Sequence, residues 1–327
     1  MTYSAGGLIQ AADYNGFVGP AASGGTANAN VNDIWSTGSS DKGYGETAVA
    51  TVSNTTTVTA TQWSTLNSRI SSLASHTNTS ITSRTSPVAG NLITILSNLN
   101  TDLTNCTTNR GNAVASGTQY KTWSGGIAKT SNTGSGTLTF THTVDFASAN
   151  AARYFFNAGG YFRWEVNKSS TGNLGDSEWN DLSSTLCGDI FFSGRVNGTT
   201  NTIAGTGYTG TTKSGGTGTP NVLATTTGYY NLTTSNTVIY RQYADTAPYT
   251  ANYIELNART ANSGQQLIFT TYWVNAEGDT YSGGTDTTSP FSSFGTAPAT
   301  YLSYYPPSST YLTSAACGTP TISCSIT

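Results

Sequence analysis

The sequence predicts a mainly β protein with a small α-helical N-terminal region: a helical hairpin followed by an antiparallel β-sandwich or jelly-roll-like domain. Composition gives the first indication, because only 9 % of the 327 residues are charged, 11 % are aromatic and 19 are tyrosine. Thr, Tyr and Phe favour pleated, half-buried surfaces, while Gly and Asn supply turns. Apolar residues also repeat with a helical period between residues 59 and 104 and alternate from about residue 118 onward.

The chain divides into four predicted segments. The segments are an N-terminal attachment segment (1–50), a helical hairpin and possible oligomerisation collar (51–117), an antiparallel β domain (118–289) and an extended, proline-rich C-terminal arm (290–327). In the first segment we expect a short helix over residues 7–17 and Trp35 as the apolar anchor.

Two apolar stripes predict the hairpin. Thr59 or Thr61 can cap the first helix, and the second begins near Pro87, a residue suited to a first helical turn. Short stripes more often pack within one chain than between chains, but this hairpin is too small to bury both. We therefore expect an oligomer seam, such as that of a trimer. The expected seam residues are Trp63, Leu66, Ile70, Leu73, Leu92, Ile95, Leu99 and Leu103.

Period-two alternation predicts the strands of the β domain. The clearest runs cover residues 138–144, 162–166, 254–258 and 267–274. The last run is apolar on both faces, which favours a central position in its sheet. One helix is expected to interrupt the strands from Asp176 to Leu186, with Asp176 or Ser177 as its cap. Its shared apolar face consists of Trp179, Leu182 and Leu186.

Cysteines and histidines give little support for a metal site. There is no C-x-x-C pair, which excludes a zinc ribbon. Cys317 and Cys324 flank a predicted turn and are either joined in a small terminal hairpin or free. Cys106 and Cys187 have the pattern of ordinary buried residues.

Signals for catalysis are equally sparse. The Gly-Asp-Ser run at 175–177 is similar to the nucleophile block of GDS-type esterases, but no histidine base follows His142 in the chain. His142 is expected to pack in or at the rim of a strand, and His76 to be solvated in a Ser/Thr-rich linker. A glycosidase needs two facing carboxylates, yet Glu165 and Glu255 fall on polar strand faces.

Binding motifs for cations, nucleotides and nucleic acids are weak or missing. Residues 275–279 suit a weak calcium loop or an ordinary Asn/Gly/Asp turn. Neither a phosphate-binding loop nor a dinucleotide fingerprint after a strand occurs. The net charge of −3 and the lack of a basic stripe argue against nucleic acid. We therefore expect no catalytic residue, no cofactor and no metal site.

Membrane insertion and secretion are not expected either. No run approaches the 18 apolar residues that a spanning helix needs. The start, Met1 to Ser4, lacks the basic and apolar regions of a secretory signal.

Tyrosine is the remaining functional signal. Exposed tyrosines among Asn, Ser and Gly make contact surfaces of low entropic cost, and aromatic faces can stack on sugars. The alternative is burial in the sheet core, which is the commoner fate of a single ring. The candidate contact residues are Tyr229, Tyr230, Tyr301, Tyr304 and Tyr305.

Several segments resemble virion structural and tail-fibre-like proteins of tailed bacteriophages of cyanobacteria and other marine bacteria. The segments are 7–15 (GLIQAADYN), 32–35 (NDIW), 41–45 (DKGYG), 58–63 (VTATQW) and 152–160 (ARYFFNAGG). They cover roughly the first half of the chain, and the last is the most specific. The resemblance supplies no catalytic residue, and it implies an N-terminal helical module for attachment and oligomerisation.

These observations lead us to expect a structural protein of a phage virion, assembled in the host cytoplasm. A tail fibre or tail appendage is the leading interpretation, with other tail proteins, copies of itself and a host-surface glycan or protein as partners. One alternative is a head-decoration, collar or baseplate component without an adhesive role. The other is a tail-spike glycan hydrolase or lyase.

Overall fold

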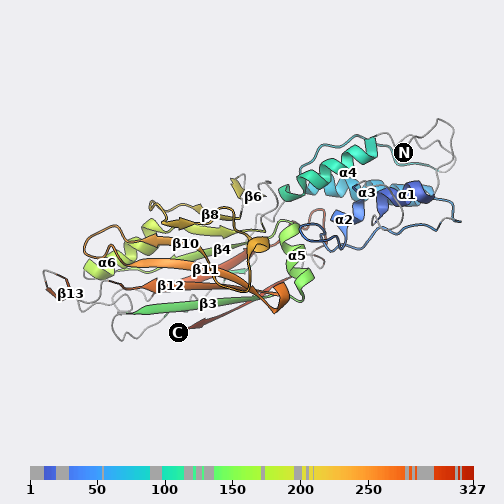
Figure 1. Ribbon diagram of the computed structural model, residues 1–327. Helices are drawn as coiled ribbons and strands as arrows, with labels where there is room; N and C mark the ends of the chain where they lie inside the picture. The colour runs from blue at the N-terminus through green and yellow to red at the C-terminus, as the bar shows by residue number, and fades with distance from the viewer. Residues whose placement is uncertain are drawn as a thin grey trace.

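The computed structural model joins a helical unit to one end of a β-sandwich, giving an elongated molecule (Figure 1). The structure describes residues 11–19, 29–53, 55–88, 98–113, 121–122, 127–128, 136–170, 174–194, 201–203, 206–208, 210–276, 280–281, 284–285, 298–313, 316 and 319–327. The protein is mainly β with a small helical N-terminal region, as the sequence predicts.

Two six-stranded antiparallel sheets form the sandwich. The first sheet has the order β1-β15-β4-β5-β8, with β2 also paired to β15. Its strands are β1 (Lys121–Thr122), β2 (Ile127–Ala128), β4 (Tyr161–Asn167), β5 (Asp189–Phe192), β8 (Thr211–Ser214) and β15 (Ala299–Tyr305). The second sheet has the order β16-β3-β12-β11-β10-β9. Its strands are β3 (Thr137–Asp145), β9 (Val222–Leu223), β10 (Thr237–Tyr243), β11 (Tyr253–Ala261), β12 (Gln266–Val274) and β16 (Thr321–Ile326).

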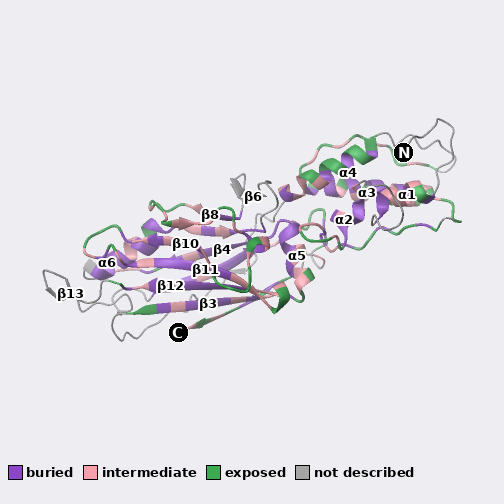
Figure 2. Cartoon of the chain, in the orientation of Figure 1, coloured by how far each residue is buried: buried purple, intermediate pink, exposed green. Residues whose placement is uncertain are grey.

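Alternation explains how these strands make a core. Along β3, Leu138, Phe140, His142 and Val144 are buried while the intervening threonines are more exposed. The purple stretches along the strands in Figure 2 mark the buried residues. Strand β12 lies between β3 and β11, so the prediction of a central strand is confirmed.

A polar contact also joins the two sheets inside this core. Trp164 of β4 is 1 % exposed, and its Nε1 donates a 2.8 Å hydrogen bond to Oγ1 of Thr271 on β12. A buried indole N–H needs such a partner, because an unpaired donor in the core costs free energy. The bond therefore joins the two sheets through buried side chains.

Short hairpins and helical turns complete the described chain. The two-stranded pairs are β6 (Asn201–Ile203) with β7 (Thr206–Tyr208) and β13 (Thr280–Tyr281) with β14 (Gly284–Thr285). The 3-10 turns are Asn109–Asn112, Tyr229–Asn231 and Asn262–Gly264.

The predicted helix at residues 176–186 is present. It consists of α6 (Leu174–Asn180) continued by a π-helical turn over Asp181–Leu186. Trp179 and Leu182 point into the sandwich core, as expected. The predicted cap is wrong, because the helix already begins at Leu174. Asp176 is fully buried and forms an ion pair with Lys168 instead.

The helical unit has its own core. It consists of α1 (Ala11–Val18), α2 (Val31–Trp35), α3 (Ala60–His76) and α4 (Leu99–Thr108). Thr59 caps α3 in a reciprocal box with Gln62, in agreement with the prediction. Tyr14 and Trp63 meet edge to face at 5.2 Å, and Trp35 is 3 % exposed. The predicted segments 1–50 and 51–117 therefore share one core.

This core corrects the predicted oligomer seam. The six described seam residues are all fully buried within the single chain; they are Trp63, Leu66, Ile70, Leu73, Leu99 and Leu103. The stripes pack against α1 and α2, so these side chains have no exposed surface left for a second copy. The hairpin does not have to bury both stripes alone, because residues 11–35 add apolar side chains to the same core. Leu92 and Ile95 lie outside the described residues.

The predicted C-terminal arm is also wrong. Strand β15 lies inside the first sheet between β1 and β4, and β16 forms the edge of the second sheet beside β3. Between these strands, Leu312 enters the helical core and Thr313 hydrogen-bonds Glu46. The C-terminal segment therefore ties both sheets and the helical unit together.

The cysteines that the structure describes are free. Cys106 and Cys187 are buried, as predicted, and Cys324 is partly buried. Cys324 therefore forms no disulfide, while Cys317 lies outside the described residues.

Candidate functional site

Helix α5 (Ala149–Asn157) is the element that joins the two units. Its Phe155 and Phe156 enter the sandwich core. Four residues apart on its other face, Arg153 and Asn157 point toward the loop at residues 36–45 of the helical unit. The segment 152–160, which carries the resemblance most specifically, is thus the connection between the units.

Backbone carbonyls of that loop accept hydrogen bonds from the side chains of Arg153 and Asn157. Arg153 donates to the carbonyls of Thr37, Ser40 and Lys42, at 2.8, 3.1 and 3.0 Å. Asn157 is 3 % exposed, and its Nδ2 donates to the carbonyls of Lys42 and Gly43 at 2.9 and 3.0 Å. Buried carbonyls need partners, so these contacts stabilise one fixed arrangement of the units.

Aromatic and polar contacts extend the junction. His76 is fully buried, its Nε2 lies 3.0 Å from the carbonyl oxygen of Ala158, and its ring meets Tyr44 edge to face. The expectation of a solvated His76 is therefore wrong, because α3 carries it into the interface. Burial lowers the pKa of His76 to about 4.

Glycines permit the close approach. Gly43 and Gly45 have φ of +95° and +78°, in the left-handed region that glycine favours. A Cβ on Gly45 would also lie 2.7 Å from the carbonyl oxygen of Ala316. The DKGYG segment is therefore explained by backbone geometry at the junction.

Two of the five candidate contact tyrosines are buried, which corrects the prediction for them. Tyr304 is 1 % exposed. Tyr229 is 8 % exposed, stacks on Phe156 at 4.6 Å and donates a 2.8 Å hydrogen bond to the carbonyl of Gly264. Tyr230 is half-buried, and its hydroxyl bonds Asn157, so it supports the junction.

Tyr301 and Tyr305 remain as candidates on the outer face of the first sheet. Both are partly exposed on β15, and Tyr305 stacks on Tyr161 at 4.5 Å with 9° between the rings. Phe191 of β5 contacts the same Tyr161. The structure thus brings together aromatic side chains from β15, β4 and β5.

Charged groups lie beside these rings. Arg163 of β4 donates hydrogen bonds to Glu165 at 2.8 Å and to Asp189 at 2.8 and 3.1 Å. Each of the three side chains is a quarter to a third exposed. We call Tyr301, Tyr305, Phe191, Arg163, Glu165 and Asp189 the outer patch.

The electrostatics of the outer patch suit binding. Burial raises the pKa of Glu165, and the nearby guanidinium of Arg163 opposes that rise. Burial alone would lower the pKa of Arg163, but Asp189 and Glu165 raise it above its ordinary value. Because one guanidinium engages both carboxylates, they are suited to accept hydrogen bonds from a ligand and less suited to serve as a free acid and base.

The sequence identifies only part of this surface. Alternation places Glu165 on a polar strand face, but Asp189 and Phe191 give no recognisable signal. Their strand β5 pairs with β4 across the helix at 174–186, and that register is not visible in the sequence. Of the weak calcium loop expected at 275–279, only Asn275 and Ala276 are described.

Comparisons with protein-family models, with curated proteins and with solved structures gave no match for this chain. Among the described residues, no helix combines the length and the apolar character needed to cross a bilayer.

Proposed function

We propose that this chain is a non-enzymatic structural protein of a tailed-bacteriophage virion, most simply a tail fibre or tail appendage. The helical unit would attach to the tail, and the sandwich would project toward the host surface. The observation that carries the proposal is the junction at α5. It fixes two separately packed units end to end in one elongated chain (Figure 1).

A rigid junction suits a mechanical role better than a catalytic one. Enzymes that close around a substrate rely on hinges that absorb backbone motion. Here Arg153 and Asn157 donate hydrogen bonds to four backbone carbonyls of one loop, those of Thr37, Ser40, Lys42 and Gly43. A force on the helical unit, or a rotation of it, would therefore be transmitted to the sandwich.

The outer patch is the surface that such a chain would present. Partly exposed aromatic rings stack on sugar faces, and flanking charged groups hydrogen-bond sugar hydroxyls. Tyr301 and Tyr305 supply the rings, and Arg163 and its two carboxylates supply the polar contacts. A host-surface glycan is therefore the ligand class that this patch fits best.

Composition of purified particles tests the proposal. Phage particles banded on a density gradient and probed with an antibody against this chain should contain it in constant ratio to other tail proteins. Recovery of the chain only in the soluble lysate fraction would overturn the proposal.

Glycan binding by the outer patch is tested separately. Tyr301→Ala with Tyr305→Ala should weaken binding of the purified chain to host cells by tenfold or more, because each stacked aromatic contributes about 1 kcal/mol. Tyr311→Ala, a change at an exposed tyrosine elsewhere, is the control. Equal binding by all variants would exclude the outer patch.

A further inference from the structure

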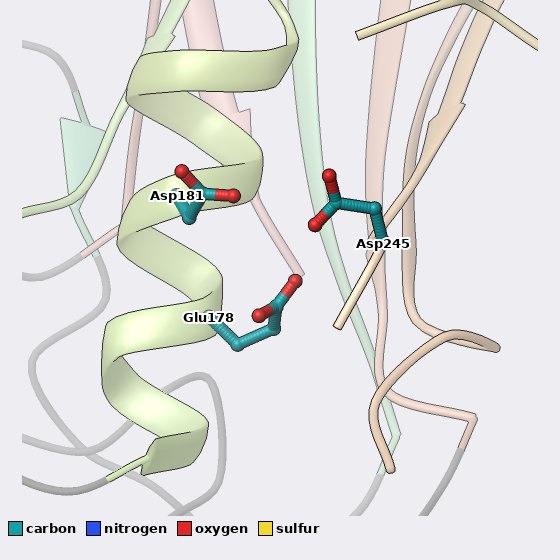
Figure 3. Close-up of side chains that lie close together, drawn as sticks. All are labelled: Glu178, Asp181 and Asp245. Carbon is teal, nitrogen blue, oxygen red and sulfur yellow. The ribbon is translucent and has the colours of Figure 1, made fainter. Parts of the chain in front are cut away.

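Three carboxylates from two parts of the chain meet at the end of the sandwich that carries α6, away from the helical unit (Figure 1). Glu178 and Asp181 lie one turn apart on the helix that includes α6, and Asp245 follows β10. One oxygen from each lies within 4.8 Å of the other two. Figure 3 shows the three side chains directed into the space between the helix and the Asp245 segment.

Glu178 gives an independent indication of a missing partner. The residue is only 6 % exposed, yet its Oε1 is buried and accepts no hydrogen bond. Thr246 faces this carboxylate as a hydrogen-bond donor. A buried carboxylate oxygen without a partner costs several kcal/mol in general, so a fold that retains one at this position needs a reason.

The charges around Glu178 also indicate that a positively charged partner is missing. None of the ion pairs found among the described residues involves Glu178, Asp181 or Asp245. Three acidic groups thus share one small volume, and no basic side chain of the described residues is paired to them.

We propose that Glu178, Asp181 and Asp245 bind a calcium ion. Carboxylate oxygens without His or Cys select hard divalent cations over zinc or copper. Two oxygens that bind one Ca²⁺ at about 2.4 Å lie no more than about 4.8 Å apart, so the three carboxylates are spaced within the limit that one shared ion sets. The exposed Asp245 leaves room for water to complete the coordination.

Calcium would link the helix to the connection between β10 and β11. Glu178 and Asp181 are fixed by the packing of Trp179 and Leu182 in the core, whereas Asp245 lies on an exposed segment. The ion would therefore order this segment against a rigid helix at the far end of the sandwich. This inference does not depend on the proposed function.

Thermal unfolding with and without calcium tests the site on the full chain. With an affinity in the millimolar to submillimolar range typical of extracellular calcium modules, about 10 mM CaCl₂ should raise the Tm by roughly 3–7 °C relative to EDTA. The same concentration of MgCl₂ should raise it less, because Mg²⁺ demands near-ideal octahedral geometry. Calorimetric titration should report one calcium bound per chain.

Two neutral variants make the test specific. Glu178→Gln and Asp245→Asn should each lose at least half of the calcium-dependent shift. In EDTA they should be as stable as the unsubstituted chain or more stable, because they remove repulsion between carboxylates. Asp145→Asn, a change at a carboxylate outside the cluster, should keep the full shift.

Three results would each contradict the proposed calcium site. No Tm shift and no binding heat for the unsubstituted chain would exclude calcium. A full shift in both neutral variants would place the ion elsewhere. An equal shift with MgCl₂ would refute the calcium assignment.

Discussion

Asn157→Ala is the sharpest test of the junction, because one side chain there serves both units. Its Nδ2 donates to the carbonyls of Lys42 and Gly43 at 2.9 and 3.0 Å, and its Oδ1 accepts from the hydroxyl of Tyr230. A buried hydrogen bond contributes about 1 kcal/mol net, so the loss of three should lower the free energy of unfolding by about 3 kcal/mol. The carbonyls of Lys42 and Gly43 would lose their donor and face a small void, which adds to this cost.

Urea unfolding followed by circular dichroism measures the effect. The midpoint of the affected transition should fall by about 1 M, given a denaturant dependence of roughly 3 kcal/mol per M. Limited proteolysis should also cleave the loop at 36–45 faster. Asn105→Ala on helix α4 is the control, because Asn105 is exposed and lies outside the junction, and it should change stability by less than about 0.5 kcal/mol. An Asn157→Ala chain as stable as this control would refute the rigid junction.

Three further predictions concern the two cores. Thr271→Val should cost about 1–3 kcal/mol in urea unfolding, because it leaves the buried Trp164 N–H without its acceptor; a neutral result would contradict the inter-sheet bond. Ile70→Ala should cost about 2–5 kcal/mol and leave the native mass by light scattering unchanged, whereas a fall in mass would restore the oligomer seam. Stability should fall as pH drops from about 6.5 to 4, because burial lowers the pKa of His76 and His142 to about 4 and the unfolded chain then binds more protons. His142→Leu should flatten that pH dependence by about half, and an unchanged slope would contradict the assignment.

Local patterns predicted most of the elements. The alternation at 138–144 gives β3 with the correct inward face, and the two apolar faces of 267–274 give β12 its central position. The stripe from Trp63 to Leu73 and the cap at Thr59 give α3. These features depend on side chains close in sequence, so a single chain is enough to find them.

Long-range pairing explains what the sequence does not reveal. The prolines near residue 306 suggest an arm, yet β15 is the partner of β4 more than a hundred residues earlier. Alternation alone does not show which tyrosines are covered, because Tyr304 faces the core only through its register with Phe162. Asp245 likewise lies near Glu178 only because of tertiary packing, since the two residues are far apart in the sequence.

Antibody labelling of intact particles in the electron microscope tests the central claim most directly. One antibody recognises the sandwich and a second recognises the helical unit. We predict that gold attached to the first antibody decorates the tail of intact virions, while the second labels only particles whose tails have been disrupted. Labelling of heads or collars, label from the helical antibody alone, or no label at all would contradict a tail protein that projects its sandwich outward.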